Sequence, residues 1–192
     1  MNQTRMKIAL VVPGGVDRSG THRVIPVLLW YIERLARRHE VHIFATHQYA
    51  ERCDYPLLGA TVHNLGYARH TASPQHWTDF TRSVRRWGPF DVLHAFWGLP
   101  CGLLAGVSGR ALRIPVVTSL AGGELVALPE IGYGVQLHRR SRWLNKLALA
   151  LATEVIVSTR YMANLAHRIG ERPHIIPLGV PVPEERARMK IG

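Results

Sequence analysis

The sequence predicts an α/β fold, a Rossmann-like three-layer domain with a mostly parallel sheet of about seven strands. The first apolar run, residues 8–12, is continuous rather than alternating, which is typical of a strand buried on both faces. A glycine-rich turn follows it, and residues 24–35 then place apolar side chains at helical spacing. Strand-like and helix-like segments alternate in the same way along the rest of the chain, and this order favours a parallel sheet.

The individual elements follow from β-prone apolar runs, helical periodicity, and Gly and Pro punctuation. Strands are expected at residues 8–12, 41–45, 61–65, 91–96, 115–120, 154–158 and 174–177. Helices are expected at residues 24–35, 73–87, 99–112, 140–152 and 161–168. Ser73 is a suitable N-cap for the second helix, with Pro74 at its first position. We therefore expect one domain over residues 1–180, and residues 181–192, polar and rich in Pro, as the start of an interdomain linker.

Composition and charge narrow the class of protein. The chain has 192 residues, of which 47% are hydrophobic and 19% charged, and this excludes a disordered protein. Lys and Arg total 24 against 13 for Asp and Glu, so the net charge of +11 predicts attraction to anions. Phosphate-bearing small molecules, acidic lipid headgroups and nucleic acid all fit, and so does a codon bias toward Arg without functional demand.

The cysteines and the apolar segments bear on the compartment. Cys53 and Cys101 match no metal or redox spacing, so neither a disulfide scaffold nor a zinc site is expected. The apolar run near the start ends at Pro13 and does not form a signal peptide. The longest other apolar stretch, residues 147–157, is far shorter than the ~20 residues of a membrane span. We expect a cytoplasmic protein, and peripheral contact with the inner face of the cell membrane stays open.

Candidate site residues are sought just after the strands, because ligands bind beyond the carboxyl ends of a parallel sheet. After the first strand, Gly14 and Gly15 permit close backbone approach to an anion, with Arg18 nearby. The interval from Gly15 to Gly20 matches a P-loop, but Thr21 occupies the position of the required Lys. An ATPase is therefore disfavoured, and a simple tight turn is the alternative.

Two further loops carry aromatic and acidic side chains. The strand at 91–96 delivers His94 and then Trp97, an aromatic face suited to sugar or lipid, although both residues suit a purely structural role too. After the next strand, Gly122 and Gly123 precede Glu124. This carboxylate could bind sugar hydroxyls or accept a proton as a base, or could simply begin a helix. Glu124 and His94 are the candidates for a catalytic residue.

Basic residues form the last two candidates. Arg160 follows the strand at 154–158, where Ser158 or Thr159 could cap the next helix and the guanidinium could reach an anion. The densest basic cluster is a candidate contact for an anionic membrane, or else a solvated helix face. It comprises Arg139, Arg140, Arg142 and Lys146. No hydrolase motif and no metal-binding motif is present in the sequence.

The order of these segments resembles the amino-terminal half of a GT-B glycosyltransferase of family 4, the group 1 type. The resemblance spans residue 6 to about residue 181. It rests on four segments in their order and spacing, namely residues 6–15, 91–95, 114–124 and 155–180. It implies a Rossmann-like acceptor-side domain that faces a second, donor-binding domain. It further implies a hexosyltransferase-like enzyme that transfers sugar from a UDP- or GDP-sugar with retention, without a metal or other cofactor.

The resemblance also implies roles for particular residues. Gly14 and Gly15 would lie against the donor phosphates or the acceptor, and residues 122–124 would lie near the transferred sugar. Two positions depart from the family pattern: Ala121 stands where many relatives have His, and Leu178 where they have Asn. The first departure removes a candidate catalytic side chain. The family's paired donor glutamates are also absent, so we expect the donor domain to lie outside this sequence and this half to be inactive alone.

A second hypothesis belongs to a different class. The chain could be a complete, non-catalytic Rossmann-like module that binds a phosphorylated ligand or nucleic acid through its basic surface. Nucleic acid is the less favoured partner, because the basic residues are scattered and no recognised nucleic-acid motif is present. The partners expected under the first hypothesis are a sugar or lipid acceptor and a nucleotide-sugar donor.

Overall fold

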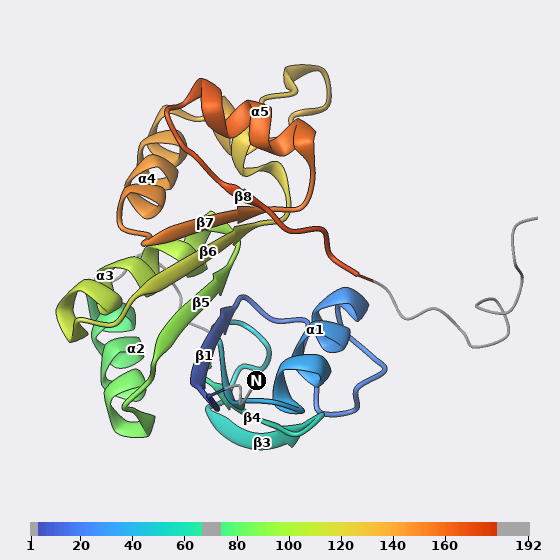
Figure 1. Cartoon of the computed structure of the whole chain (residues 1–192), viewed down its shortest axis with the longest axis vertical. Coiled ribbons are helices and arrows are strands. Elements are labelled where there is room, and N and C mark those ends of the chain that lie inside the picture. Colours follow the sequence, from blue (N-terminus) through green and yellow to red (C-terminus); the bar gives the residue numbers. More distant parts are fainter. Residues whose placement is uncertain (1–3, 67–73, 180–192) are drawn as a thin grey trace, which may run out of the picture.

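The computed structural model describes residues 4–66 and 74–179, which fold around one eight-stranded sheet (Figure 1). The strand order is β3-β4-β2-β1-β5-β6-β7-β8, and every neighbouring pair is parallel except β3 with β4. The strands are β1 (Lys7–Val12), β2 (Glu40–Ala45), β3 (Cys53–Leu57), β4 (Ala60–Asn64), β5 (Val92–Phe96), β6 (Val116–Leu120), β7 (Glu154–Val157) and β8 (His174–Ile175). The predicted α/β class and mostly parallel sheet are confirmed.

The strand β3 corrects the expected count of about seven. It carries Pro56, which cannot donate to a ladder and suits the sheet edge where β3 lies. Only Tyr55 and Leu57 of this strand are buried, so its apolar signal is weak. A tight turn at Leu58 and Gly59, both with positive φ (50° and 83°), returns the chain into antiparallel β4.

Five α-helices pack on the two faces of the sheet within the described ranges. They are α1 (Pro26–Ala36), α2 (Pro74–Trp87), α3 (Leu103–Leu112), α4 (Arg139–Ala150) and α5 (Arg160–Arg168). The helix expected at 99–112 begins later, because the π-type turn η1 (Gly98–Gly102) precedes it and Leu99 has non-helical dihedral angles. Ser73, the expected N-cap of α2, and residues 181–192 lie outside the described residues. In the ranges described, no helix is long and apolar enough to cross a membrane.

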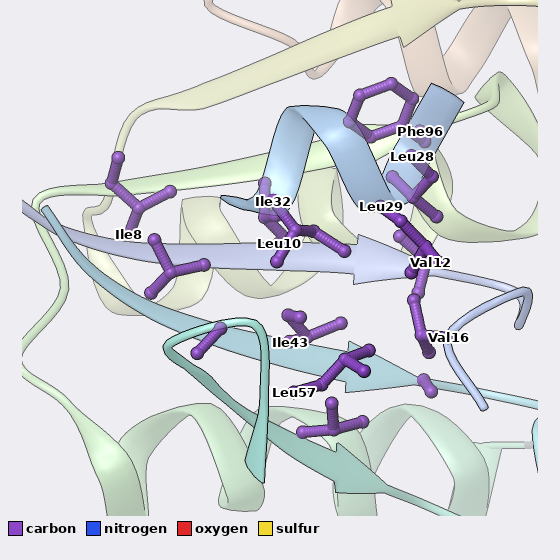
Figure 2. Close-up of a cluster of buried hydrophobic side chains, with 14 of the residues drawn as sticks. Ile8, Leu10, Val12, Val16, Leu28, Leu29, Ile32, Ile43, Leu57 and Phe96 are labelled. Carbon is purple, nitrogen blue, oxygen red and sulfur yellow. The ribbon is translucent and has the colours of Figure 1, made fainter. Parts of the chain in front are cut away.

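The core divides between the two faces because neighbouring side chains of a strand point in opposite directions. Leu10 and Val12 of β1 pack with α1, whereas Ala9 and Val11 pack with buried residues of α2 and α3. Figure 2 shows the first cluster, with Leu28, Leu29 and Ile32 of α1 lying over β1 and β2. A third cluster joins β6 and β7 to α4 and α5. The sheet is therefore buried on both faces through its centre, as the continuous apolar runs predict.

The topology fixes where a ligand would bind. From β1 the chain moves to β2 on one side and later returns to β5 on the other side. The two connections diverge at the carboxyl ends of β1 and β5, which makes this edge the topological switch point of the sheet. The loops that begin at Pro13 and Trp97 both leave from it.

Candidate functional site at the sheet switch point

The glycine-rich loop after β1 is held in a tight conformation. Gly15 has φ of +79°, and a Cβ at this position would lie 2.5 Å from Cγ1 of Ile25. The Ile25 N–H donates to the Gly15 carbonyl at 3.0 Å, so the loop folds back against the start of α1. At Gly14, a Cβ would lie 3.2 Å from Oε1 of Gln48. These close approaches give a structural reason for glycine at both positions. They also hold the backbone of this loop at the switch point.

Asp17 organises the remainder of this loop. Its Oδ1 accepts from the Ser19 N–H at 3.0 Å, and its Oδ2 accepts from the Tyr49 hydroxyl at 2.8 Å and from Nε2 of Gln48 at 3.3 Å. The Ser19 N–H, the largest influence, and the other donors lower the pKa of Asp17 to about 2. Asp17 is therefore a carboxylate at neutral pH and ties the loop after β1 to the loop after β2.

Arg18 extends from this loop over aromatic rings. Its guanidinium carbon lies 4.8 Å from the ring centroid of Tyr49 and 5.4 Å from that of Tyr55. A hydrogen bond from its Nη2 to Sγ of Cys53, 3.6 Å long, also directs it toward β3. The guanidinium is exposed, so it can contact an anion while remaining stacked on the two tyrosines.

The loop after β5 carries the only aromatic residue with positive φ among the described residues. Trp97 has φ of 71° and ψ of 139°, a strained conformation for a residue other than glycine. Its N–H donates to the Ser119 carbonyl at 2.9 Å, and its carbonyl accepts from the Gly102 N–H at the same distance. The indole lies against Gly122, where a Cβ would be 3.3 Å from Nε1. Trp97 thus joins the loop after β5 to the loop after β6.

Glu124 links the same two loops through its carboxylate. The side chain is buried, with 3% exposure, within the short 3-10 turn η2 (Gly123–Leu125). Oε1 accepts from the N–H groups of Gly98 and Ala121 at 3.3 and 3.4 Å, and Oε2 accepts from the Gly122 N–H at 2.8 Å. Three donors therefore surround a carboxylate for which the sequence suggested a catalytic base or the first turn of an α-helix. Glu124 lies in the first turn of η2, a 3-10 turn rather than an α-helix, and its carboxylate also holds the loop of Ala121 and Gly122 in place.

Two residues that the sequence did not single out, Gln136 and Asn145, donate hydrogen bonds to the backbone carbonyl of Glu124. Asn145 of α4 is fully buried, and its Nδ2 donates to the Glu124 carbonyl at 3.2 Å. Nε2 of Gln136 donates to the same carbonyl at 2.7 Å. A Cβ at Gly98 would lie 2.2 Å from Oδ1 of Asn145, so a larger residue there would displace the Asn145 amide. An Asn within an otherwise amphipathic helix is the one sequence signal that could have indicated this contact.

His94 lies within β5 and is buried with 7% exposure. Its Nδ1 is 3.0 Å from the Tyr31 hydroxyl and its Nε2 is 2.8 Å from Oγ of Ser119. Burial lowers the pKa of His94 to about 4 and raises that of Tyr31 to about 12, so both groups are neutral at pH 7. A neutral imidazole with a hydroxyl at each nitrogen has its hydrogen-bonding capacity used within the fold, which favours a positioning role.

The basic candidates lie along the neighbouring helices. Thr159 caps α5 by accepting from the Met162 N–H at 3.2 Å, so the expected hydroxyl cap is confirmed, and Arg160 is exposed in the first turn. Arg139, Arg142 and Lys146 of α4 line a groove of about 610 Å³ together with Arg168 of α5. Arg140 is exposed but does not line it.

Comparison of the sequence with protein families gives one match, over residues 24–179, to the family described as glycosyl transferase 4-like domain. The match includes the loops that carry Trp97 and Glu124 and begins after the glycine-rich loop. No curated protein matches the sequence.

Solved structures with similar folds come from longer chains. Sucrose-phosphate synthase from Thermosynechococcus elongatus is 15% identical, with a TM-score of 0.62, and the alignment covers 95% of this chain and 52% of that one. Anabaena HepE in complex with UDP and glucose is 15% identical, with a TM-score of 0.60 and coverage of 96% and 49%. S. aureus MnaA with UDP is 13% identical, with a TM-score of 0.57 and coverage of 86% and 43%. The chain spans about half the length of these structures, and the similarity shows a shared fold.

Proposed function

Since the chain belongs to the glycosyl transferase 4-like domain family, we propose that it is the acceptor-side half of a retaining glycosyltransferase. In this proposal a sugar passes from a nucleotide-sugar donor, such as a UDP- or GDP-sugar, to a sugar or lipid acceptor without a metal or other cofactor. The family match over residues 24–179 is the observation that carries the proposal. The enzyme would work in the cytoplasm, with peripheral contact to the inner face of the cell membrane.

The length of the similar structures supports a missing second half. This chain covers about half of each one, 52% and 49% in the first two cases. Neighbouring large apolar side chains at the end of β8 and just after it also remain exposed on the described surface, with Ile175 at 46% and Ile176 at 52% exposure. Exposed apolar surface of this kind is typical of an interface. We therefore infer that a donor-binding domain completes the active site and that this half alone does not transfer sugar.

The geometry at the switch point suggests how this half would contribute. Trp97 is partly buried and brings the Nε1 edge of its indole close to Gly122 just after β5, and we infer that the accessible part of the ring meets the apolar face of a sugar. The glycine-rich loop offers backbone close to the same sheet edge, with Arg18 and, on the other side, Arg160 as exposed cations. Stabilisation of the diphosphate leaving group would then be shared with the donor domain, which lies outside this chain.

Glu124 and His94 have positioning roles in this proposal. The Glu124 carboxylate accepts from the N–H groups of Gly98, which follows Trp97, and Gly122, which the indole contacts. His94 bonds to the Ser119 hydroxyl, and the Ser119 carbonyl accepts from the Trp97 N–H. Because the hydrogen-bonding atoms of both side chains are occupied inside the fold, neither is available to move a proton for the substrate. The chemistry would therefore depend on binding and electrostatics, not on a base from this half.

The competing hypothesis is a complete binding module for a phosphorylated ligand or nucleic acid. The family match and the half-length coverage do not favour it. The two hypotheses differ in a measurable way, because a half-enzyme binds UDP or GDP weakly, whereas a complete module binds its phosphorylated ligand tightly. Calorimetric titration of the 192-residue chain with UDP and GDP separates them.

The direct test measures sugar transfer by the native polypeptide that contains this sequence. Radiolabelled UDP- and GDP-sugars are supplied with an extract of the source cells as acceptor, and transfer is compared for wild type, Trp97→Ala and Trp97→Phe. We expect the transfer activity of Trp97→Ala to fall roughly tenfold or more, and Trp97→Phe to retain most of it. The reason is that contact of a sugar with an aromatic face contributes about 1–2 kcal/mol. No transfer from any nucleotide-sugar, or equal activity of all three proteins, would contradict the proposal.

A further inference from the structure

The groove between α4 and α5 concentrates positive charge from two helices. It has a volume of about 610 Å³. Arg139, Arg142 and Lys146 reach it from one face of α4, because residues three, four and seven apart lie on the same side of a helix. Arg168 reaches it from the end of α5, which follows α4 and β7 in the chain. Two consecutive helices of the chain thus direct four cations into one groove.

These four cations have no acidic partner. No Asp or Glu is among the residues that line the groove, and within residues 4–66 and 74–179 none of the four cations forms an ion pair. Like charges that share a groove repel one another, and a bound anion would remove that repulsion. The first turn of α4 contains no acidic residue either, although helix N-termini favour negative charge. The charges that line the groove therefore favour binding of an anion.

The groove also has an aromatic wall. Trp143 lines it and is 63% exposed, between Arg139 one turn before it and Lys146 one turn after it. Gln136 and the buried Asn145 add amide groups to the lining. An exposed indole flanked by cations suits a ligand with a phosphate at one end and an apolar or sugar moiety beside it.

We propose that the groove between α4 and α5 binds a phosphate-bearing ligand, with Arg139, Arg142, Lys146 and Arg168 as its charge partners and Trp143 against the adjoining moiety. The phosphate comes from a lipid headgroup or from a soluble phosphorylated molecule, and both offer the same chemistry to the groove. This inference deepens the proposed membrane contact and rests on the proposed function only for its biological setting. Sugar transfer can fail while phosphate binding in the groove holds, and the reverse is equally measurable.

The test compares variants with a matched control on the same helix. Arg142→Glu and Arg168→Glu reverse charges inside the groove, whereas Arg140→Glu makes the same change outside it. All three side chains are exposed, and circular dichroism verifies that the variants fold. One arm titrates pyrophosphate into the chain at low salt and follows tryptophan fluorescence, with Trp143→Phe identifying the reporter. The other arm sediments phosphatidylcholine vesicles with and without phosphatidylglycerol.

The expected result is position-dependent loss of binding. Each groove variant should weaken pyrophosphate or vesicle binding by about fivefold or more, because a cation near an anionic surface contributes roughly a factor of five. Arg140→Glu should bind as wild type does. Binding only to phosphatidylglycerol vesicles identifies a lipid headgroup, and binding of pyrophosphate alone identifies a soluble ligand. Equal weakening by Arg140→Glu, or no binding in either arm, would overturn the proposal.

Discussion

The Glu124 carboxylate accepts a hydrogen bond from the Gly98 N–H across two neighbouring loops, at 3.3 Å from Oε1. Gly98 follows β5 and Glu124 follows β6, so this contact joins the ends of adjacent parallel strands. The same carboxylate also accepts from Ala121 and Gly122. One buried side chain therefore ties Gly98, which follows Trp97, to the loop of Ala121 and Gly122 after β6.

Replacement of Glu124 should destabilise the fold. In Glu124→Gln, one carboxylate oxygen becomes an NH₂ group that faces backbone donors, and an unsatisfied buried donor costs about 1–3 kcal/mol. Urea unfolding followed by fluorescence measures the change, with Glu130→Gln, an exposed residue of the next loop, as control. A Glu124→Gln change no larger than that of the control would show that the carboxylate does not hold these loops.

Gly15→Ala should destabilise more than alanine at another positive-φ glycine. Both Gly15 (φ +79°) and Gly132 (φ +64°) disfavour a side chain, at a cost of roughly 1–2 kcal/mol each. Only at Gly15 would the new Cβ also meet Ile25, at 2.5 Å, whereas nothing lies within 4 Å at Gly132. Overpacking adds about 1–3 kcal/mol. Thermal unfolding should thus rank wild type above Gly132→Ala and Gly132→Ala above Gly15→Ala, and an inverted order of the variants would contradict the observed loop packing.

Acid should destabilise the protein in two separate pH ranges. The pKa of His94 falls from 6.5 to about 4 on folding because of burial, so the folded state binds this proton less tightly than the unfolded state does. Neutral His94 therefore makes its full contribution to the free energy of unfolding above pH 6.5. This contribution is lost as the pH falls toward 4, and the total loss is about 3 kcal/mol at 1.36 kcal/mol for each pKa unit. Asp17, whose pKa falls from 3.8 to about 2, loses its contribution only below pH 3.8.

The two contributions are separable by substitution. Unfolding free energies measured by urea at a series of pH values should fall less steeply between pH 6.5 and 4 for His94→Gln than for wild type. Asp17→Asn should keep the wild-type slope in that range and flatten the profile only at lower pH. Parallel profiles for wild type and His94→Gln would contradict a contribution of His94 to the upper range, in which burial also lowers the pKa values of His47, His63 and His76.

The two cysteines should differ in reactivity. Cys101 is fully buried and burial raises the pKa of its thiol, which suppresses the reactive thiolate. Cys53 is partly exposed on the edge strand β3. Under native conditions a thiol reagent should modify Cys53 rapidly and Cys101 slowly. The substitution Cys53→Ser should therefore remove the fast phase of modification. Rapid modification of both thiols in the folded protein would contradict the observed burial of Cys101.

The sequence predicted those elements whose signal is local. Continuous apolar runs such as residues 8–12 identified the central strands, because strands buried on both faces leave no polar alternation. The edge strand β3 was missed because it is short, half exposed and contains Pro56. The late start of α3 follows from the π-type turn at residues 98–102, where Gly98 packs against Asn145, more than forty residues later. No local pattern contains that information.

The same division holds for the site. The loops at the strand ends were predictable, since a parallel sheet collects them at one edge. The roles of Glu124 and His94 were not predictable, because each depends on partners from distant segments, such as Tyr31 for His94. Likewise, the cluster of cations on α4 is visible in the sequence, but its fourth member, Arg168, joins it only through the packing of α5.

The proposed function requires this chain to be one half of a two-domain glycosyltransferase. The most direct test is the intact mass of the polypeptide that carries this sequence, purified from its source cells and measured together with any protein that co-purifies. We expect a polypeptide about twice as long as these 192 residues, or a partner chain that supplies the donor domain, because similar structures are about twice as long. A polypeptide of this length alone, without such a partner, would contradict it.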